Sequence, residues 1–376
     1  MRCARVGRGR LRRLQKGAGP ARFPRPLALA VIALTFFSGA QAQTLTPFVP
    51  STTRKPKIVR LLAYPEFFDP HAFEAFEQAT GYAVAYDAYS LALEIPDKWK
   101  DGPYDLVALP GPALAKRIAA GALGKLDKSR LPNARGVQGA VSQKLGAYDP
   151  TGAYGVVFGW APYGLIYDAK KVPERLGAQP DSGGALLDPR FSRKLATCGV
   201  VAPNARDAMF VAAWRLLGVD PGRLRPLDVK SAAFLLARAK PAMQGFAVPD
   251  PIGALARGSD CLTLGTPGEA AAANARAKSM GDPAEIAFAL PKEGGGVELE
   301  AFAIPRDAQN PELAYKLLDF LMKSEIAEAD SLAAGLNSSE SVKDLEMMKR
   351  LWPLGAFDDS FAQAIETEWT HVRTAK

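Results

Sequence analysis

Segments that read as short β-strands alternate with segments that read as helices along two long parts of the chain. The first series has strand-like runs at residues 57–64, 82–89 and 104–111. Asp69 followed by Pro70 begins a helix between the first two of these runs, and Gly81 ends it. The second series has strand-like runs at residues 196–203, 261–265 and 284–291. Alternation in units of this length predicts an α/β fold with two lobes and a ligand cleft between them.

The amino-terminal residues are typical of a secretory signal peptide. Leu27 to Phe37 is an apolar run that follows Arg22 and Arg25, and a small-x-small site, Ala40-Gln41-Ala42, comes after it. A membrane anchor is the alternative, but the run is well short of the roughly 20 residues that span a bilayer. We therefore expect residues 1–42 to be cleaved, residues 43–55 to form a mobile leader, and the mature protein to be periplasmic.

The basic charge of the chain belongs to this leader. The full sequence has a formal net charge of +8, and nine of its basic residues lie in residues 1–42, where there is no acidic residue. The rest of the chain has 38 Lys and Arg against 39 Asp and Glu, which argues against a nucleic-acid partner. Residues 43–376 exceed what one compact core usually serves. We expect lobe 1 to contain residues 56–158 and 300–324, and lobe 2 to contain residues 159–299 and 325–376.

The chain has three cysteines, and Cys3 lies in the predicted signal peptide. Cys198 and Cys261 each lie in or beside a strand-like run of an exported chain, which favours a disulfide between them. Two separately buried thiols are the alternative.

Motifs of catalysis are missing from the sequence. GxSxG, HExxH, a P-loop and GxGxxG do not occur, and the two histidines, His71 and His371, offer few candidates for a general base or a zinc ligand. Together with export and two α/β lobes, this pattern favours a binding protein over an enzyme, with no cofactor and no metal.

Several segments carry a resemblance to a known family. The densest are YDLVALPG, AAGALGKLDKSRLPN, AYDPTGAYGVVFGW and GLIYDAKKV, with further segments CGVVAP, GSDCLTLG and LPKEGG. With these segments the chain resembles the periplasmic spermidine/putrescine-binding proteins, the receptors of ABC importers. The resemblance implies a type II periplasmic binding protein fold, hinge closure on a small cationic ligand of polyamine type, a monomer, and an inner-membrane ABC permease as partner. It also places Cys198 and Cys261 where putrescine receptors carry a bridged pair.

A polyamine needs carboxylates for its ammonium groups and aromatic faces along its apolar stem. In the family's first motif, an acid lies between aromatic residues in the loop after the first strand. This loop contains Tyr64, Glu66 and Phe67, which the resemblance makes ligand residues. Glu66 could instead be a solvated acid near a helix start.

The other site segments depart from the polyamine pattern but stay acidic. Thr266 stands at the position of a stacking tryptophan, and Glu269 stands at that of an amine-binding aspartate. Glu269 could instead interact with a helix dipole. In VELEAF, Glu298 takes the position of an aromatic residue and Glu300 that of an aspartate. Residues two apart in a strand face the same side, so these would present paired carboxylates, unless they lie on a solvated face.

Three further positions follow from the resemblance. Gly111 replaces a serine, Gly335 falls near the family's late aromatic residue, and Asp207 falls at or beside an acid of the family. The site hypothesis is therefore Tyr64, Glu66, Phe67, Gly111, Asp207, Thr266, Glu269, Glu298 and Glu300. Two alternatives stay open: a receptor for a different small molecule, such as a metal or an organic anion, and a receptor that has lost transport and contacts a signalling partner.

Overall fold

The computed structural model describes residues 57–375, except residues 66, 90–93, 138, 282–283 and 341–344. The predicted signal peptide (1–42), the predicted leader (43–55) and Glu66 lie outside the described residues. No helix within the described ranges is long and apolar enough to cross a membrane.

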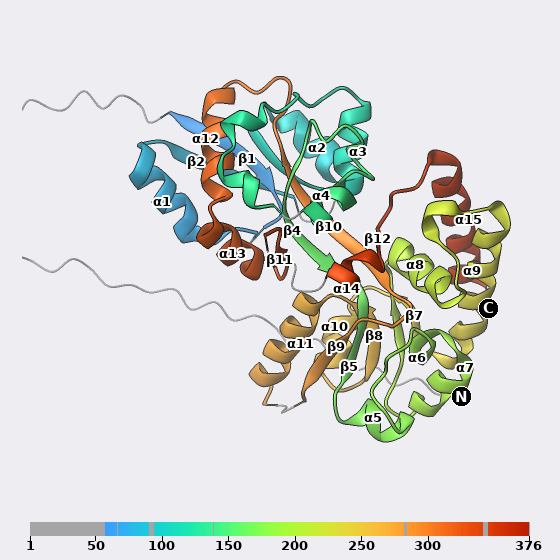
Figure 1. Ribbon diagram of the computed structural model, residues 1–376. Helices are drawn as coiled ribbons and strands as arrows, with labels where there is room; N and C mark the ends of the chain where they lie inside the picture. Colours follow the sequence, from blue (N-terminus) through green and yellow to red (C-terminus); the bar gives the residue numbers. More distant parts are fainter. Residues whose placement is uncertain are drawn as a thin grey trace, which may run out of the picture. The chain divides into compact units, whose positions relative to one another are not determined.

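A mixed sheet forms the centre of the first lobe (Figure 1). Its strand order is β11-β4-β10-β3-β1-β2, and β12 pairs with β10. The bounds of these strands are β1 (Ile58–Ala63), β2 (Ala83–Ala88), β3 (Leu106–Pro110), β4 (Val156–Pro162), β10 (Gly295–Ala303), β11 (Asn337–Ser338) and β12 (Leu351–Pro353). β1 is parallel to β2 and β3, as strands that alternate with helices usually are, while β10 is antiparallel to β3 and β4.

Helices cover this sheet because two of its strands, β3 and β4, are apolar on both faces. Every residue of β3 and β4 is buried, as expected for strands with helices on both sides. The helices of this part are α1 (Pro70–Thr80), α2 (Ile95–Lys98), α3 (Gly111–Ala119), α4 (Gly139–Leu145), α12 (Pro311–Leu321), α13 (Ser324–Ala333) and α14 (Leu345–Lys349).

Helix α1 begins and ends as the sequence predicts. The Asp69 side chain accepts a hydrogen bond from the backbone N–H of His71, and Gly81 ends the helix in the left-handed conformation with φ of 72°. Phe68, which precedes the cap, packs on Phe73 with ring centroids 5.6 Å apart. These contacts fix the path of the loop from β1 to α1, which carries Tyr64 and Phe67.

The second lobe contains two smaller sheets, with orders β8-β5-β9 and β6-β7. Their strands are β5 (Gly164–Asp168), β6 (Val201–Pro203), β7 (Gly245–Val248), β8 (Leu262–Gly265) and β9 (Ile286–Ala289). The helices around them are α5 (Lys171–Leu176), α6 (Gly184–Leu187), α7 (Pro189–Ser192), α8 (Arg206–Leu216), α9 (Pro226–Ala239), α10 (Pro251–Ala256), α11 (Pro267–Ser279) and α15 (Asp359–Thr374). Short 3₁₀ turns are η2 (Trp99–Asp101), η3 (Lys128–Arg130), η4 (Asn133–Gly136), η5 (Arg193–Leu195), η6 (Pro221–Arg223) and η7 (Lys240–Ala242).

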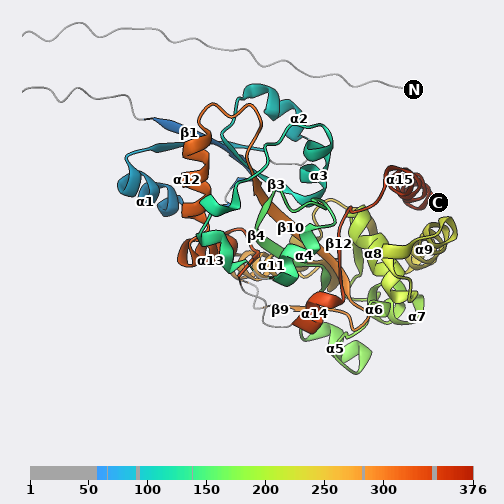
Figure 2. The ribbon, with the colours of Figure 1, turned by 45° about the horizontal axis from the view of Figure 1, so that its top comes forward.

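The carboxy-terminal helix belongs to the core of the second lobe. Figures 1 and 2 show α15 beside α9, and the two helices are in contact. Ile365 and Trp369 are buried there and Phe361 is partly buried, so one side of α15, with residues at a spacing of four, belongs to the core.

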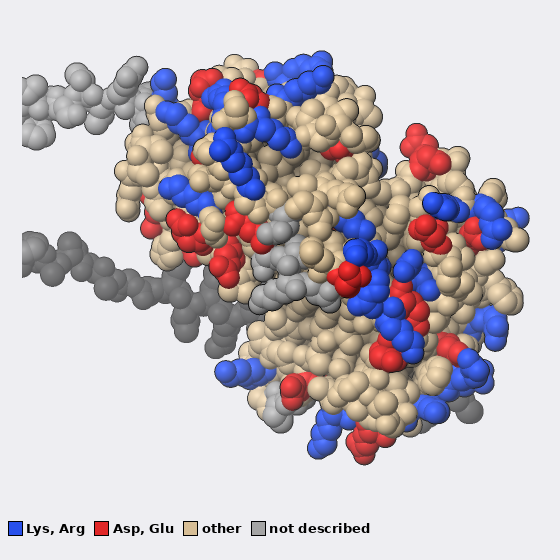
Figure 3. All heavy atoms as spheres, viewed as in Figure 1, with Lys and Arg blue, Asp and Glu red and all other residues tan. Residues whose placement is uncertain are grey.

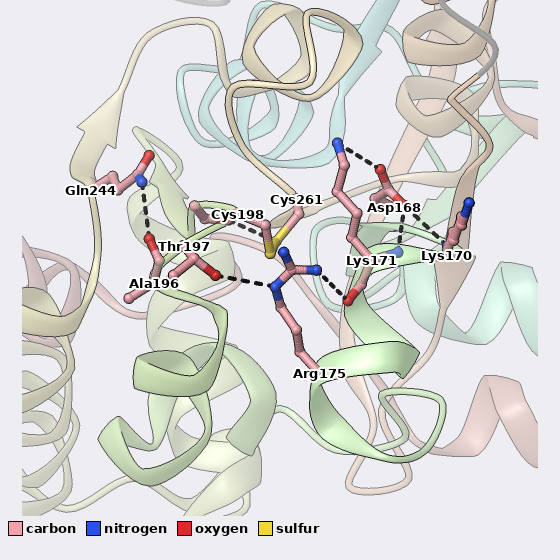
Figure 4. Close-up of a disulfide and its surroundings, with 10 residues drawn as sticks. Asp168, Lys170, Lys171, Arg175, Ala196, Thr197, Cys198, Gln244 and Cys261 are labelled. Carbon is pink, nitrogen blue, oxygen red and sulfur yellow. Dashed lines mark hydrogen bonds and ion pairs between the residues drawn. A yellow bond between two sulfur atoms is a disulfide. The ribbon is translucent and has the colours of Figure 1, made fainter.

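The predicted disulfide is present. Cys198 and Cys261 are bonded and lie in the same apolar cluster of the second lobe. Figure 4 shows the bond beside Arg175, whose guanidinium donates to the Thr197 hydroxyl at 3.2 Å. The bridge therefore joins the segment before β6 to the start of β8.

Two neighbouring strands of the large sheet lead directly into the second lobe. Tyr163 separates β4 from β5, and β10 follows β9 after a short turn. The backbone N–H of Tyr163 donates to the carbonyl of Gly296 at 2.8 Å, so the two connections are hydrogen-bonded to each other. The lobe boundaries remain predictions. We propose two changes to them. Residues 325–333 belong to lobe 1, because α13 contacts α12, β4 and β11 of the first lobe. Residues 334–340 and 345–353 belong there too, because β11 and β12 pair with strands of its sheet.

Candidate functional site

Two cavities lie where elements of both lobes meet. The large cavity has a volume of about 840 Å³ and is lined by α3 of the first lobe and by the start of α8 of the second. The small cavity has a volume of about 390 Å³ and is lined by the start of α11 and the residues that follow α13. Both cavities share Tyr64, Tyr163 and Glu298 as lining residues.

The structure brings the residues of the site hypothesis together around these cavities. Tyr64, Gly111, Asp207 and Glu298 line the large cavity. Tyr64, Phe67, Thr266, Glu269, Glu298 and Glu300 line the small cavity, together with Gly335. Their roles toward a ligand remain predictions.

The paired carboxylates of β10 are at the centre of the site. Glu298 pairs with Ala161 of β4, and Glu300 lies between Pro110 of β3 and Gly159 of β4, where it is only 1% exposed. Neither carboxyl oxygen of Glu300 has a hydrogen-bond partner among the described residues. A buried carboxyl without partners is unfavourable, so this group is available to a donor that enters the small cavity.

The surroundings of both carboxyls favour their protonated forms. Burial raises the pKa of Glu300 well above its usual range, and the charge of Glu298 raises it further. Burial, followed by the charge of Glu269, raises the pKa of Glu298 to about 7, and a hydrogen bond with Tyr163 partly opposes this rise. A cationic ligand between them would reverse these effects, because an opposite charge stabilises the ionised carboxylate.

Glu269 has a structural role as well as a place in the small cavity. The Thr266 N–H donates to the Glu269 carboxylate at 2.8 Å, and the Glu269 N–H donates to the Thr266 hydroxyl at 3.2 Å. This reciprocal pair is a capping box at the start of α11. Burial raises the pKa of Glu269, while its hydrogen bonds with Thr266 lower it. Glu269 therefore presents a fixed carboxyl to the cavity.

Asp207 already has a partner of opposite charge. The guanidinium of Arg206 donates to the Asp207 carboxylate at 2.7 Å and to the Glu366 carboxylate at 2.5 Å. One cation thus serves two acids of the large cavity.

Glycines set the shape of the site at two places. A Cβ atom on Gly111 would lie 2.2 Å from the ring of Tyr148, so that ring fills the space a serine would need. A Cβ on Gly268, in the first turn of α11, would lie 2.2 Å from the carbonyl oxygen of Gly335, which follows α13. The backbones of the two lobes therefore approach closely beside the small cavity, and Gly335 has a φ of 69° there.

Sequence reasoning did not assign a role to two tyrosines of the site. Tyr163 lines both cavities, and the charge of Glu298, followed by burial, raises its pKa well above the usual range, so its hydroxyl stays a neutral donor. Tyr148 lines the large cavity, and its hydroxyl donates to the carbonyl of Leu354. Residues 154–158 and 165–167 are aromatic and β-branched runs typical of strands. The position of Tyr163 between these runs was the available signal, since a residue at a crossover lies between lobes.

Aromatic faces line the site near the first strand. The Tyr64 ring lies 4.3 Å from that of Tyr89 and 5.0 Å from that of Phe67, measured between centroids. The described ranges contain no group of three or more His, Cys, Asp and Glu side chains that could hold a metal ion.

Relatives of known function resemble this chain along most of its length. The putrescine-binding periplasmic protein SpuD of Pseudomonas aeruginosa (strain UCBPP-PA14) is 29% identical over 340 residues, which cover 85% of this chain and 93% of SpuD. The putrescine-binding periplasmic protein PotF of Escherichia coli (strain K12) is 28% identical over 341 residues, covering 85% and 92% of the two chains.

Solved structures share the fold. The spermidine/putrescine ABC transporter substrate-binding protein PotD of Streptococcus pneumoniae aligns with a TM-score of 0.73 and 16% identity, over 85% of this chain and all of PotD. The Tp0655 lipoprotein of Treponema pallidum aligns with a TM-score of 0.68 and 21% identity, over 84% and 99% of the two chains. The predicted two-lobed periplasmic binding protein fold is thereby confirmed.

The sequence also matches a family directly, since residues 71–351 match the bacterial extracellular solute-binding proteins. This match covers more than half of the chain and includes every described residue of the site hypothesis except Tyr64 and Phe67. The chain belongs to the family of bacterial extracellular solute-binding proteins.

Proposed function

We propose that this protein is the periplasmic receptor of an ABC importer and that it binds a small ligand with at least one amine or guanidine group, of polyamine type. The observation that carries the proposal is the wall of the small cavity. Three acids, Glu269, Glu298 and Glu300, line it, and its described lining contains no Lys or Arg. The putrescine-binding relatives favour the same ligand chemistry.

The site supports this chemistry in three ways. An ammonium or guanidinium group between Glu298 and Glu300 would provide the donors that the Glu300 oxygens lack within the described chain. Tyr64 and Phe67 would cover the apolar stem and contribute cation–π contacts. Tyr163 would hold Glu298 in place through its hydroxyl.

Binding would close the two lobes around the ligand. Tyr163 and the adjoining turn before β10 form the strand connections about which such a hinge can move. The closed monomer would then deliver the ligand to an inner-membrane permease. The proposal also includes export by the predicted signal peptide, action without catalysis or a cofactor, and the absence of a nucleic-acid partner. Figure 3 is consistent with the last point, because positive and negative side chains are interspersed on the face that it shows.

A thermal-stability screen of the mature chain tests the proposal. Putrescine, cadaverine, spermidine, agmatine and basic amino acids are the probes, and a ligand at 100 times its dissociation constant adds about 2.7 kcal/mol to the stability. We expect at least one of them to stabilise the wild type and Glu77→Gln, an exposed change on α1, but not Glu300→Gln. Absence of stabilisation by every probe at millimolar concentration would refute the proposed ligand class.

A further inference from the structure

The two cavities differ in the charge of their walls. The acids of the small cavity face no Lys or Arg of its described lining. The large cavity is lined by four cationic side chains, Lys116, Arg117, Arg206 and Arg373, against three acids, Asp207, Glu298 and Glu366. Glu298 lies in the wall that both cavities share, so the cations dominate the remainder of the large cavity.

The pairing of these charges increases the difference. Arg206 is bound to both Asp207 and Glu366, which leaves these two acids already paired. No ion pair with another described residue is formed by Lys116, Arg117 or Arg373. The guanidinium of Arg117 lies over the ring of Trp99, 4.4 Å from its centroid, which leaves its charge uncompensated by an acid.

The three cations come from both lobes. Lys116 and Arg117 are on α3 of the first lobe, and Arg373 is on α15 of the second. An anionic group between them would be attracted to both lobes, whereas a second ammonium group at the same place would be repelled by all three cations.

We infer that the ligand is amphoteric: an amine or guanidine end lies in the small cavity, and a carboxylate at the other end lies in the large cavity against Lys116, Arg117 and Arg373. The inference rests on the proposed function, because it extends the same amine site by a second group. The free basic amino acids have this arrangement, with a side-chain cation separated from a carboxylate by an apolar stem. Their α-ammonium group lies next to the carboxylate, where Asp207 and Glu366 of the same lining would be its acidic neighbours. Simple diamines do not.

Three pairs of compounds isolate the carboxylate: ornithine and putrescine, lysine and cadaverine, and arginine and agmatine. The members of each pair differ only by the carboxylate. Calorimetric titration of the mature protein should show that at least one amino acid binds about tenfold or more tightly than its decarboxylated counterpart. The preference should weaken with added salt, because the three cations are partly exposed.

Variants assign the preference to the large cavity. Lys116→Gln with Arg373→Gln should bring the ratio of the two affinities close to one, mainly through weaker binding of the amino acid. Lys230→Gln, an exposed change on α9 outside both cavities, is the matched control and should keep the full ratio. Circular dichroism and the melting temperature confirm that the variants are folded.

Each other outcome overturns the inference in a distinguishable way. A diamine that binds as tightly as its amino acid removes the carboxylate from the ligand but leaves the proposed function intact. An amino-acid preference that persists in the double variant shows that the carboxylate does not lie against these cations. Failure of both members of every pair to bind overturns the inference together with the proposed function.

Discussion

Replacing Glu298 with glutamine should stabilise the unliganded protein above neutral pH while it weakens amine binding. Burial and the charge of Glu269 raise the pKa of Glu298 from 4.5 to about 7 in the folded state. The folded protein therefore holds a proton that the unfolded chain releases between these two values. Because the folded state binds more protons in this window, stability falls as the pH rises from 4.5 to 7 and stays at the lower level above it.

The size of this effect follows from the two pKa values. At roughly 1.4 kcal/mol for each pKa unit, a rise from 4.5 to about 7 corresponds to at most about 3.5 kcal/mol. One side of Glu298 faces the cleft, where water screens its charge, so about 1 to 3 kcal/mol is the expected loss. Glutamine keeps an oxygen that can accept from Tyr163 but never ionises, so the variant lacks this pH-dependent loss.

Urea unfolding at pH 4.5 and pH 8.5 measures the effect. We expect Glu298→Gln to match the wild type at the lower pH and to exceed its free energy of unfolding by about 1 to 3 kcal/mol at the higher pH. The exposed change Glu77→Gln should produce no such pH-dependent difference. If Glu298→Gln destabilises the protein equally at both pH values, or leaves amine binding unchanged, the account of this carboxyl is wrong.

Three other outcomes follow from the same structure. The affinity for the amine should rise between about pH 6 and pH 8, and binding should release protons, because the cation binds the ionised carboxyls. Calorimetric titrations in buffers of different ionisation enthalpy measure the number of protons released. An affinity that does not change with pH, without proton release, would contradict this prediction. The bond between Cys198 and Cys261 closes a loop with a sequence separation of 63, so replacing both residues with alanine should lower the free energy of unfolding by up to roughly 4 kcal/mol; urea unfolding that is unchanged would contradict this. Gly268→Ala should weaken ligand binding about tenfold, since the new Cβ would press on the carbonyl of Gly335 and hold the lobes apart. Gly183→Ala, which has open space around it, should not weaken binding. Equal affinities of the two variants in calorimetric titration would show that the Gly268 contact plays no part in lobe closure.

Because side chains of a β-strand point to alternate faces, the paired carboxyls of the site could be predicted from the sequence. Glu298 and Glu300 are two apart in a strand-like run, which is enough to place both carboxyls on one face. The complete burial of Glu300 was not predictable, because it depends on β3 and β4 pairing on either side of β10. Only the order of strands in the folded sheet supplies that information.

The residues that mark a helix start in the sequence could have a structural role, a role in the site, or both. Thr266 and Glu269 have the spacing of a capping box, yet a helix start alone does not show whether it lies at a cleft. The structure shows both properties at once, since the pair caps α11 and lines the small cavity.

Local sequence patterns could not predict contacts between segments that lie far apart in the chain. Tyr148, which follows α4, covers Gly111 at the start of α3, and Gly268 of α11 meets Gly335, which follows α13. Neither contact has a periodicity or a motif in the sequence. The disulfide was accessible by contrast, because a chain that is predicted to be exported, with only Cys198 and Cys261 after its predicted signal peptide, leaves one intramolecular pairing.

Calorimetric titration of the mature wild type and of Glu300→Gln with the same panel of amines and basic amino acids tests the central claim most directly. The claim is that buried carboxyls of β10 hold the cationic end of a small ligand. We predict saturable binding of at least one compound to the wild type with one ligand per chain, and at least a hundredfold loss of affinity in Glu300→Gln with its fold retained. Equal affinity of the two proteins, or no binding to the wild type at millimolar concentration, would contradict the claim.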